Sequence, residues 1–260
     1  MSKTFASCLK SVRTKNINRI IFSHVNINSI RNKFELLADA VTGNVDVLLI
    51  SETKIDASFT NAQFHLEGFT PPYRLDRNMN GGGILLYIRN DIPSKEVKNI
   101  TFDIEGFFVE INIRKKKWLL CCSYNPNHSM ISNHLKEIEK NLHLVLSDYD
   151  NIICSGDFNT EPSDASMIEF CENFDFKHLI KEPTCFKNPN NPKCIDLMIT
   201  NSPTCFQNST VIETNLSDFH KMTVTVMKMN FPKQVPKITN YRSHKNFSNE
   251  NFRDKVIKSL

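Results

Sequence analysis

The sequence lacks any hydrophobic run of the roughly 18 residues needed to cross a bilayer, and its N-terminus has no apolar segment of signal-peptide length. It contains 8 cysteines among 260 residues but no C-x-x-C pair, which argues against a zinc ribbon. Internal repeats and low-complexity tracts are also missing. Cys185, Cys194 and Cys205 share one loop-rich segment and could hold a metal or a bridge, but no histidine is suitably spaced among them. We therefore expect a soluble, intracellular protein in a reducing compartment, with structural thiols.

Charge is distributed unevenly along the chain. The net charge is +4, yet residues 1–20 carry five bases and no acid, and residues 221–260 carry nine bases and two acids. Residues 21–220 therefore hold 18 bases and 26 acids. An acidic body with basic ends is not the pattern of a protein that simply coats DNA. It suits a body that concentrates carboxylates around a cation, although most of these charges are expected on the solvated surface.

Strand-like and helix-like segments alternate, which predicts an α/β protein whose sheets are covered by helices. Short apolar runs between turn residues predict strands at 19–27, 45–50, 83–88, 107–113, 117–124, 151–156, 195–200 and 222–228. Apolar residues at helical spacing predict helices at 30–41 and 131–148, with a shorter one at 165–173. We expect one domain over 18–230, preceded by a basic N-terminal extension at 1–17. Residues 231–260 are polar, basic and proline-punctuated, which predicts a linker with a short helix after Ser248.

Polar side chains collect where the predicted strands end. Six strand ends carry acids, amides, a phenol or an imidazole, namely Asn26 and Asn28, Glu52, Tyr124 and Asn125, Asp157 and Asn159, Asp196, and Asp218 with His220. Loops at strand ends are where functional side chains gather in layered α/β folds. Any one of these residues could simply cap a turn, as Asn and Asp often do. The recurrence at six strand ends instead favours one shared site.

The residue types in this set suit the hydrolysis of a phosphoester. Glu52, Asp157 and Asp218 offer the hard oxygen ligands that Mg²⁺ prefers. An Asp-x-His pair can orient an imidazole for acid or base work at cellular pH. Asn and Tyr side chains can bind a phosphate without adding negative charge. Together these groups predict metal-assisted attack of a water on phosphorus.

An ordered set of motifs carries a resemblance to a known family. The stretches "VNINSIRNK", "LLISETKI", "GGGILLYI", "YNPN", "SGDFNTEPSD", "CIDLMIT" and "LSDFHKMTV" resemble the endonuclease/exonuclease/phosphatase superfamily, which has the deoxyribonuclease I-like fold. They look most like the apurinic/apyrimidinic-type endonuclease domain of a non-LTR (LINE-like) retrotransposon polyprotein, over residues 18–230. The resemblance implies a four-layered α/β sandwich, in which two mixed β-sheets lie face to face between flanking helices. The basic segment at 231–260 resembles the stretch that leads toward a reverse transcriptase in such elements.

The resemblance also implies which residues bind the cofactor and the substrate. Asn26, Glu52 and Asp218 would hold a Mg²⁺ ion, which Mn²⁺ could replace. Asn28 would lie beside the ion and contact the substrate. Thr184, in "EPTCF", would contact DNA flanking the cut.

The chemical step is assigned in the same way. By resemblance, Tyr124 would contact the scissile phosphate and Asp157 would align or deprotonate the attacking water. Asn159 would stabilise the pentacoordinate phosphate. Asp218 and His220 would form the acid–imidazole pair.

The last motif departs from the family pattern, which reads Ser-Asp-His. Phe219 intervenes here, so the imidazole of His220 comes one residue late. On a regular strand this shift would turn the side chain to the opposite face. We expect a bulge or a loop to restore it to the site. By resemblance, Asp196 would support this imidazole or form the floor of the site. If His220 did not reach the site, His24 would be a distant substitute for it.

These patterns predict a Mg²⁺-dependent endonuclease that nicks double-stranded DNA and leaves a 3′-hydroxyl to prime reverse transcription. Such a protein would act in the nucleus and use no membrane. Three alternatives stay open: a phosphoesterase acting on inositol phosphates or lipids, an enzyme acting at abasic sites, and a catalytically decayed element copy. The glycines at 81–83 and the basic run at 114–117 are expected to be a turn and a hairpin tip.

Overall fold

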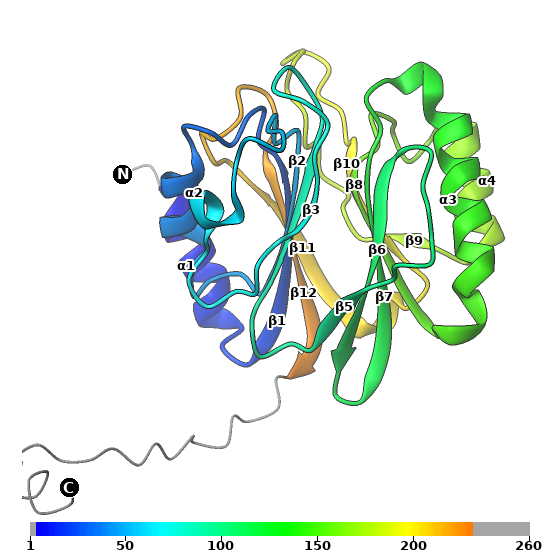
Figure 1. The fold of residues 1–260 in the computed structure, drawn as a ribbon, viewed down its shortest axis with the longest axis horizontal. Helices are drawn as coiled ribbons and strands as arrows, with labels where there is room; N and C mark the ends of the chain where they lie inside the picture. The colour runs from blue at the N-terminus through cyan, green and yellow to red at the C-terminus, as the bar shows by residue number, and fades with distance from the viewer. Residues whose placement is uncertain (1–3, 231–260) are drawn as a thin grey trace, which may run out of the picture.

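The computed structural model of the protein describes residues 4–230, so the predicted linker at 231–260 and its short helix lie outside the described residues. Two six-stranded sheets form the centre of the molecule, with strand orders β11-β12-β1-β2-β4-β3 and β5-β6-β7-β8-β10-β9. In Figure 1 the sheets stand side by side, with α1 and α2 on one outer face and α3 and α4 on the other. The predicted four-layered α/β sandwich is confirmed.

The elements follow one another in an interleaved order. The first sheet contains β1 (Arg19–Asn26), β2 (Val47–Ser51), β3 (Tyr73–Leu75), β4 (Ile84–Ile88), β11 (Phe206–Ile212) and β12 (Met222–Asn230). The second contains β5 (Ser94–Glu96), β6 (Glu105–Ile113), β7 (Lys116–Tyr124), β8 (Asn151–Asp157), β9 (Lys177–His178) and β10 (Asp196–Thr200). The α-helices are α1 (Phe5–Lys15), α2 (Phe34–Val41), α3 (Ile131–Val145) and α4 (Ala165–Asn173). Short 3₁₀ turns lie at Asn61–Phe64, His128–Met130, Leu146–Asp148 and Pro203–Cys205.

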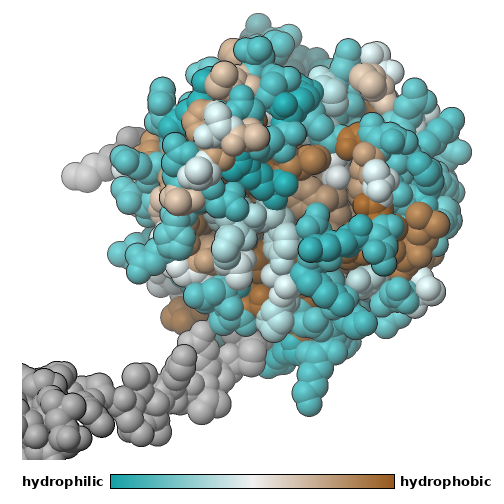
Figure 2. Space-filling view, in the orientation of Figure 1, coloured by the Kyte–Doolittle hydropathy of each residue, from teal (hydrophilic) through white to brown (hydrophobic). Residues whose placement is uncertain are grey.

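Three hydrophobic layers hold the sandwich together. Strand β1 shows how, because its side chains alternate between two of them. Ile21 and Val25 pack under α1 and α2, whereas Ile20 and Phe22 face the second sheet. A third layer joins the outer face of the second sheet to α3 and α4. Hydrophilic residues cover most of the face in Figure 2, and hydrophobic ones show in its middle. Among residues 4–230, no helix is long and apolar enough to cross a membrane.

The segment predicted as a basic N-terminal extension contains helix α1, which packs onto the domain. Phe5 and Leu9 are buried in the layer under the first sheet, one helical turn apart. Arg13, in the last turn, donates to the buried carboxylate of Asp46 at 2.5 Å, and Arg89 binds the other oxygen of that carboxylate at 2.5 Å. The Asp46 carboxylate therefore ties α1 to the sheet.

The connection of the strands brings several of their ends to one edge of the sandwich. Strands β1 and β2 are parallel, as are β7 and β8, so within each pair the carboxyl ends lie together. Strand β12 runs antiparallel to β1, and β10 runs antiparallel to β8. The amino ends of β10 and β12 therefore meet the carboxyl ends of their neighbours. The site described next lies at this edge.

Candidate active site

An open cavity of about 940 Å³ lies at this edge, and most of the predicted site residues, though not Asp196, Asp218 or Thr184, line it from both sheets. Asn26 and Glu52 come from the ends of β1 and β2, and Tyr124 and Asp157 from the ends of β7 and β8. His220 precedes β12. Lys187, Lys193, Asn188 and Asn191 line the cavity from the segment that precedes β10. The cavity thus joins acidic groups to a basic and amide-rich wall.

Asn26 connects the two sheets through its side-chain amide. Its Nδ2 donates to Glu52 Oε1 at 3.0 Å and to Asp157 Oδ2 at 2.8 Å. Tyr124 donates its hydroxyl to the same Glu52 oxygen at 2.9 Å. Glu52 has a left-handed backbone, with φ of 53°, at the point where β2 turns into the following loop. Two carboxylates from different sheets are therefore held next to one another by a neutral donor.

The pKa values of these two carboxylates are shifted in opposite directions. Burial and the nearby Asp196 raise the pKa of Asp157 to about 7. Burial would also raise the pKa of Glu52, but the hydrogen bonds from Asn26 and Tyr124 and the charge of Lys54 lower it overall. Near neutral pH, Glu52 is therefore ionised while Asp157 can gain or lose a proton. This division of states is typical of sites that use one acid for binding and another for proton transfer.

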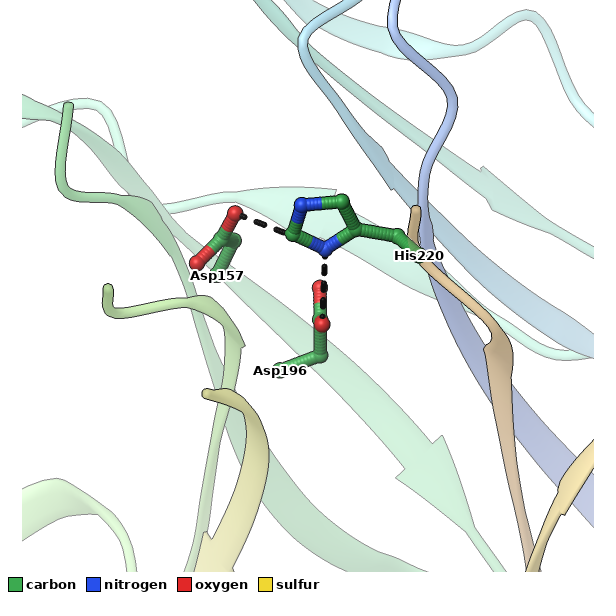
Figure 3. A group of neighbouring side chains, drawn as sticks. All are labelled: Asp157, Asp196 and His220. Atoms are coloured by element: carbon green, nitrogen blue, oxygen red, sulfur yellow. Dashed lines mark hydrogen bonds and ion pairs between the residues drawn. The ribbon is translucent and has the colours of Figure 1, made fainter. Parts of the chain in front are cut away.

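Asp196 and His220 form an acid–imidazole pair beside Asp157 (Figure 3). His220 Nδ1 lies 2.9 Å from Asp196 Oδ2 and 4.0 Å from Asp157 Oδ2. Burial would lower the pKa of His220, but the Asp196 carboxylate outweighs this effect and raises it to about 11. Burial would raise the pKa of Asp196, but the imidazolium lowers it overall. The ring is therefore positively charged at neutral pH, and Asp196 occupies its Nδ1, which leaves Nε2 for another group.

The predicted pairing of Asp218 with His220 is not formed, whereas Asp196 contacts the imidazole, as the resemblance also implies. Asp218 is exposed, and Asn28 Nδ2 lies 3.4 Å from its Oδ2 at the surface. The bend at 215–219 turns the acid outward, whereas β10 brings Asp196 under the imidazole across the sandwich. Asp218 therefore lies apart from the pair and does not line the cavity.

The extra residue before His220 is absorbed in the loop. Asn215 has a positive φ of 56°, residues 215–219 form a bend, and regular strand β12 begins only at Met222. The strict alternation of a strand therefore does not apply to His220, whose ring points into the site, and Phe219 is 45% exposed at the cavity. His24, the other histidine considered, lies on the far side of Asp196, with its Nδ1 3.6 Å from Asp196 Oδ1.

Thr184 does not have the substrate-facing position that the resemblance implies. Its side chain is fully buried, so it cannot contact DNA. Its hydroxyl oxygen accepts hydrogen bonds from the backbone N–H groups of Ile195 and Asp196 at 3.1 and 3.0 Å. Thr184 therefore fixes the start of β10, from which the Asp196 carboxylate reaches His220.

Asn28 and Asn159 both line the cavity from left-handed backbone positions, with φ of 48° and 49°. The backbone N–H of Asn159 donates to Asp157 Oδ1 at 2.9 Å, and its side-chain amide donates to the backbone carbonyl of Asn125 at 2.7 Å. Lys54, which the sequence interpretation did not single out, hydrogen-bonds Asn28 Oδ1 and lies 3.4 Å from Glu52 Oε2. Its position two residues after Glu52 in "SETK" was the available signal.

Two groups of side chains could take part in holding a cation. Asp157, Asp196 and His220 offer ligand atoms within 4.8 Å of one another, but Oδ2 of Asp196 is already paired with the charged imidazole. Glu52 is ionised, lies at the cavity and adjoins the buried Asp157 through Asn26. One or two carboxylates with open space for water and phosphate fit Mg²⁺. Of the predicted metal ligands, Asn26 and Glu52 therefore lie together, and Asp218 lies apart from them.

Comparisons with known proteins agree with this architecture. The endonuclease domain of TRAS1, a telomere-specific non-LTR retrotransposon, has a TM-score of 0.63 at 16% identity, covering 81% of this chain and 99% of that chain. An AP endonuclease from Archaeoglobus fulgidus has a TM-score of 0.61 at 14% identity, covering 81% and 100%. The 3′ phosphatase NExo from Neisseria, bound to product DNA hairpin, has a TM-score of 0.63 at 12% identity, covering 80% and 99%.

At these identities the solved structures establish similarity of fold alone. A search of curated proteins found no match to the sequence. The sequence model of the Endonuclease/Exonuclease/phosphatase family matches residues 23–218. This range contains the cavity residues at the ends of β1, β2, β7 and β8, and it ends two residues before His220. The chain therefore belongs to the Endonuclease/Exonuclease/phosphatase family, whose members hydrolyse phosphodiester bonds.

Proposed function

We propose that this protein is a Mg²⁺-dependent endonuclease that nicks one strand of duplex DNA and leaves a 3′-hydroxyl. One observation carries the proposal: Glu52, Asp157 and His220, from separate strand ends, meet at one open cavity, with Asp196 buried behind the imidazole. Lys187 and Lys193 line the same cavity and offer ammonium groups to an extended phosphate backbone, with Glu161 Oε2 3.8 Å from Lys193 Nζ. The fold similarity to the TRAS1 endonuclease domain supports a nicking role in retrotransposition.

Glu52 and Asn26 are the residues that would hold the ion, next to Asp157. Mn²⁺ would replace Mg²⁺ there, since both cations accept carboxylate, amide and water oxygens. When bound, the ion would supply positive charge that stabilises the negative charge added to the phosphate. Lys54 lies 3.4 Å from Glu52 Oε2 and holds the remaining side of that carboxylate.

Asp157 is the proposed base for the attacking water. With a pKa of about 7, its carboxylate can accept a proton at cellular pH. The water oxygen forms a bond to phosphorus as its proton passes to Asp157, and the bond from phosphorus to the 3′ oxygen breaks. The departing oxygen takes a proton from solvent, so the products are a 3′-hydroxyl and a 5′-phosphate. The Asn159 side chain lies at the cavity beside this carboxylate, where it can bind the phosphate.

His220 is the proposed donor to the phosphate. Its Nδ1 is engaged by Asp196, and its positive charge favours contact between Nε2–H and a phosphate oxygen as negative charge builds up. The Tyr124 hydroxyl donates to Glu52, and burial and that carboxylate raise its pKa, so the phenol stays neutral. We therefore assign Tyr124 to positioning Glu52 and to contact with the scissile phosphate.

The experiment is nicking of supercoiled plasmid with Mg²⁺, by wild type, by Asp157→Ala and by the control Asp175→Asn. Asp175 is a surface carboxylate with 81% of its side chain exposed. Wild type and Asp175→Asn should nick equally, and Asp157→Ala should lose roughly 100-fold or more in rate. The nicks should prime a DNA polymerase directly, which requires a free 3′-hydroxyl. Equal nicking by Asp157→Ala, or no nicking by wild type, would refute the proposal.

The same assay separates the rival activities of this fold. An inositol-phosphate or lipid phosphatase would spare the plasmid and release phosphate from small substrates. An abasic-site enzyme would cut an oligonucleotide with one abasic position far faster than the intact duplex. A decayed copy would show no activity and no Mg²⁺-dependent rise in melting temperature. If nicking occurs, the protein would act where chromosomal DNA lies, and a reverse transcriptase module would extend the 3′ end.

A further inference from the structure

A second histidine, His24, lies behind the acid–imidazole pair. It is on β1, two residues before Asn26, so both side chains point to the same face of the strand. That face is the one on which Phe22 packs against the second sheet. The imidazole of His24 is completely buried there. A polar ring in an otherwise apolar layer requires hydrogen-bond partners for both of its nitrogen atoms.

The two nitrogens of His24 face two different partners. Nε2 lies 3.0 Å from the hydroxyl of Ser51, the last residue of β2. Nδ1 lies 3.6 Å from Asp196 Oδ1. Within residues 4–230, neither Nδ1 of His24 nor Oδ1 of Asp196 has a hydrogen-bond partner. These two unsatisfied buried atoms face each other, and an unpaired polar atom inside a protein destabilises the folded state.

The protonation of the His24 ring follows from its surroundings. The ring is completely buried and its Nδ1 faces a carboxylate oxygen, which can only accept, and in the uncharged ring one nitrogen carries the single N–H proton. If that proton were on Nε2, a nitrogen lone pair would face the Asp196 carboxylate. With the proton on Nδ1, the ring donates toward Asp196 while Nε2 accepts from the Ser51 hydroxyl. The second arrangement satisfies both nitrogens.

We propose that His24 is a positioning residue, which donates from Nδ1 to Asp196 Oδ1 and so fixes the carboxylate that orients His220. Asp196 then lies between two imidazoles, one bound to each oxygen. A carboxylate held at only one oxygen can rotate and present either oxygen to His220. Pinning Oδ1 leaves Oδ2 in one place, which fixes the direction of His220 Nε2 toward the cavity. This inference rests on the proposed hydrolytic function for its kinetic consequence only.

Two substitutions separate the two contacts of the His24 ring. In His24→Asn the amide nitrogen falls close to the position of Nδ1, so the donor to Asp196 is kept and the contact with Ser51 is lost. In His24→Gln the longer amide reaches toward Ser51, and the donor to Asp196 is lost. Both variants place an amide in the same buried space, so a purely structural role would affect them alike. His134→Gln is the matched control, because His134 is also buried and its Nε2 lies 2.5 Å from a serine hydroxyl, that of Ser123.

The first readout is NMR of the metal-free protein, in which the His220 Nδ1–H proton is assigned by its loss in His220→Asn. Wild type, His24→Asn and His134→Gln should keep this resonance, and His24→Gln should shift it or lose it through exchange with water. The second readout is plasmid nicking by folded protein. His24→Gln should lower kcat by roughly 10- to 100-fold with KM unchanged, and His24→Asn should recover most of that loss.

The two readouts fail independently. If wild type does not nick DNA, the proposed function is wrong, and the NMR comparison still decides whether His24 orients His220. If His24→Asn and His24→Gln give the same His220 resonance, the positioning role is refuted. Equal kcat values for the two variants in an active enzyme would also overturn it.

Discussion

Replacing Asp157 by asparagine tests the electrostatics of the site in the absence of metal. Burial and Asp196 raise the pKa of Asp157 from 3.8 to about 7. The unfolded chain therefore releases this proton at a lower pH than the folded protein does. The resulting stabilisation is complete below about pH 4 and is lost as the pH rises through about 7. A difference of about three pKa units corresponds to at most about 4 kcal/mol, at roughly 1.4 kcal/mol per unit.

The amide of Asp157→Asn carries no charge at any pH, so the variant escapes this loss. Its oxygen can still accept from the Asn159 N–H, while the donor from Asn26 must find another acceptor, at a cost of about 1 kcal/mol at every pH. Relative to wild type, the variant should therefore gain roughly 2–4 kcal/mol in the free energy of unfolding between about pH 5 and about pH 8.5. The Asp196–His220 pair is present in both proteins, so the comparison measures the Asp157 charge together with its interaction with that pair.

The assay is urea denaturation with a chelator at the two pH values, because the midpoint and slope give the free energy of unfolding. Asp175→Asn, which changes an exposed acid, should show the same pH dependence as wild type. The reasoning would be refuted if the difference between Asp157→Asn and wild type were constant with pH, or larger at the acidic value. Such a result would mean that the Asp157 carboxyl group is not destabilised by its burial.

Three further changes test single contacts. Glu52→Gln should abolish most of the rise in melting temperature that Mg²⁺ produces, as measured by thermal denaturation with and without the ion, because it removes the ionised ligand at the cavity. Gly156→Ala should destabilise the protein by about 3 kcal/mol or more in urea denaturation, because a Cβ there would lie 1.7 Å from the Ser123 carbonyl oxygen, on a backbone with φ of 152°. Thr184→Val should cost about 1–3 kcal/mol by the same measurement, and should also lower the nicking rate, because two buried N–H groups at the start of β10 lose their acceptor.

The strands and helices that periodicity predicted are those with enough buried apolar residues to show a pattern. In the sequence, the stretch of β6 from Val109 to Ile113 alternates apolar and polar residues, and α3 has an apolar stripe, so both elements were predictable. Strands β3, β5 and β9 are edge segments of two or three residues, too short for any period. Helix α1 was not predicted, because only Phe5 and Leu9 are buried in it. Two such apolar positions in residues 1–20, which carry five bases, give too weak a helical pattern to recognise in the sequence.

The site residues divide in a similar way. Asp157 and Glu52 could be identified as site residues from the sequence, because a polar side chain close behind a run of apolar residues is a local signal for the end of a buried strand. Asp196 was assigned to support the imidazole only by resemblance, because local spacing favours Asp218, two residues from His220, over Asp196, which lies 24 residues away in sequence. That pairing is decided by how β10 and β12 approach one another across the sandwich. The burial of Thr184 was not predictable for a related reason: the sequence of a loop does not show which of its side chains are buried.

The position of His24 follows from the same geometry and explains why a histidine is tolerated inside the sandwich. The site draws Asn26, Glu52 and His220 from the first sheet and Asp157 and Asp196 from the second. Charged groups from the two sheets can meet only at the edge of the apolar layer that lies between the sheets. The strand residues at that edge must therefore include polar side chains. Ser51 and His24 lie at that edge on β2 and β1, and His24 Nδ1 lies 3.6 Å from the Asp196 oxygen that has no hydrogen-bond partner among residues 4–230. The buried side of the site therefore consists of core residues, namely His24, Ser51 and Asp196. Its geometry depends on the packing of the two sheets against each other.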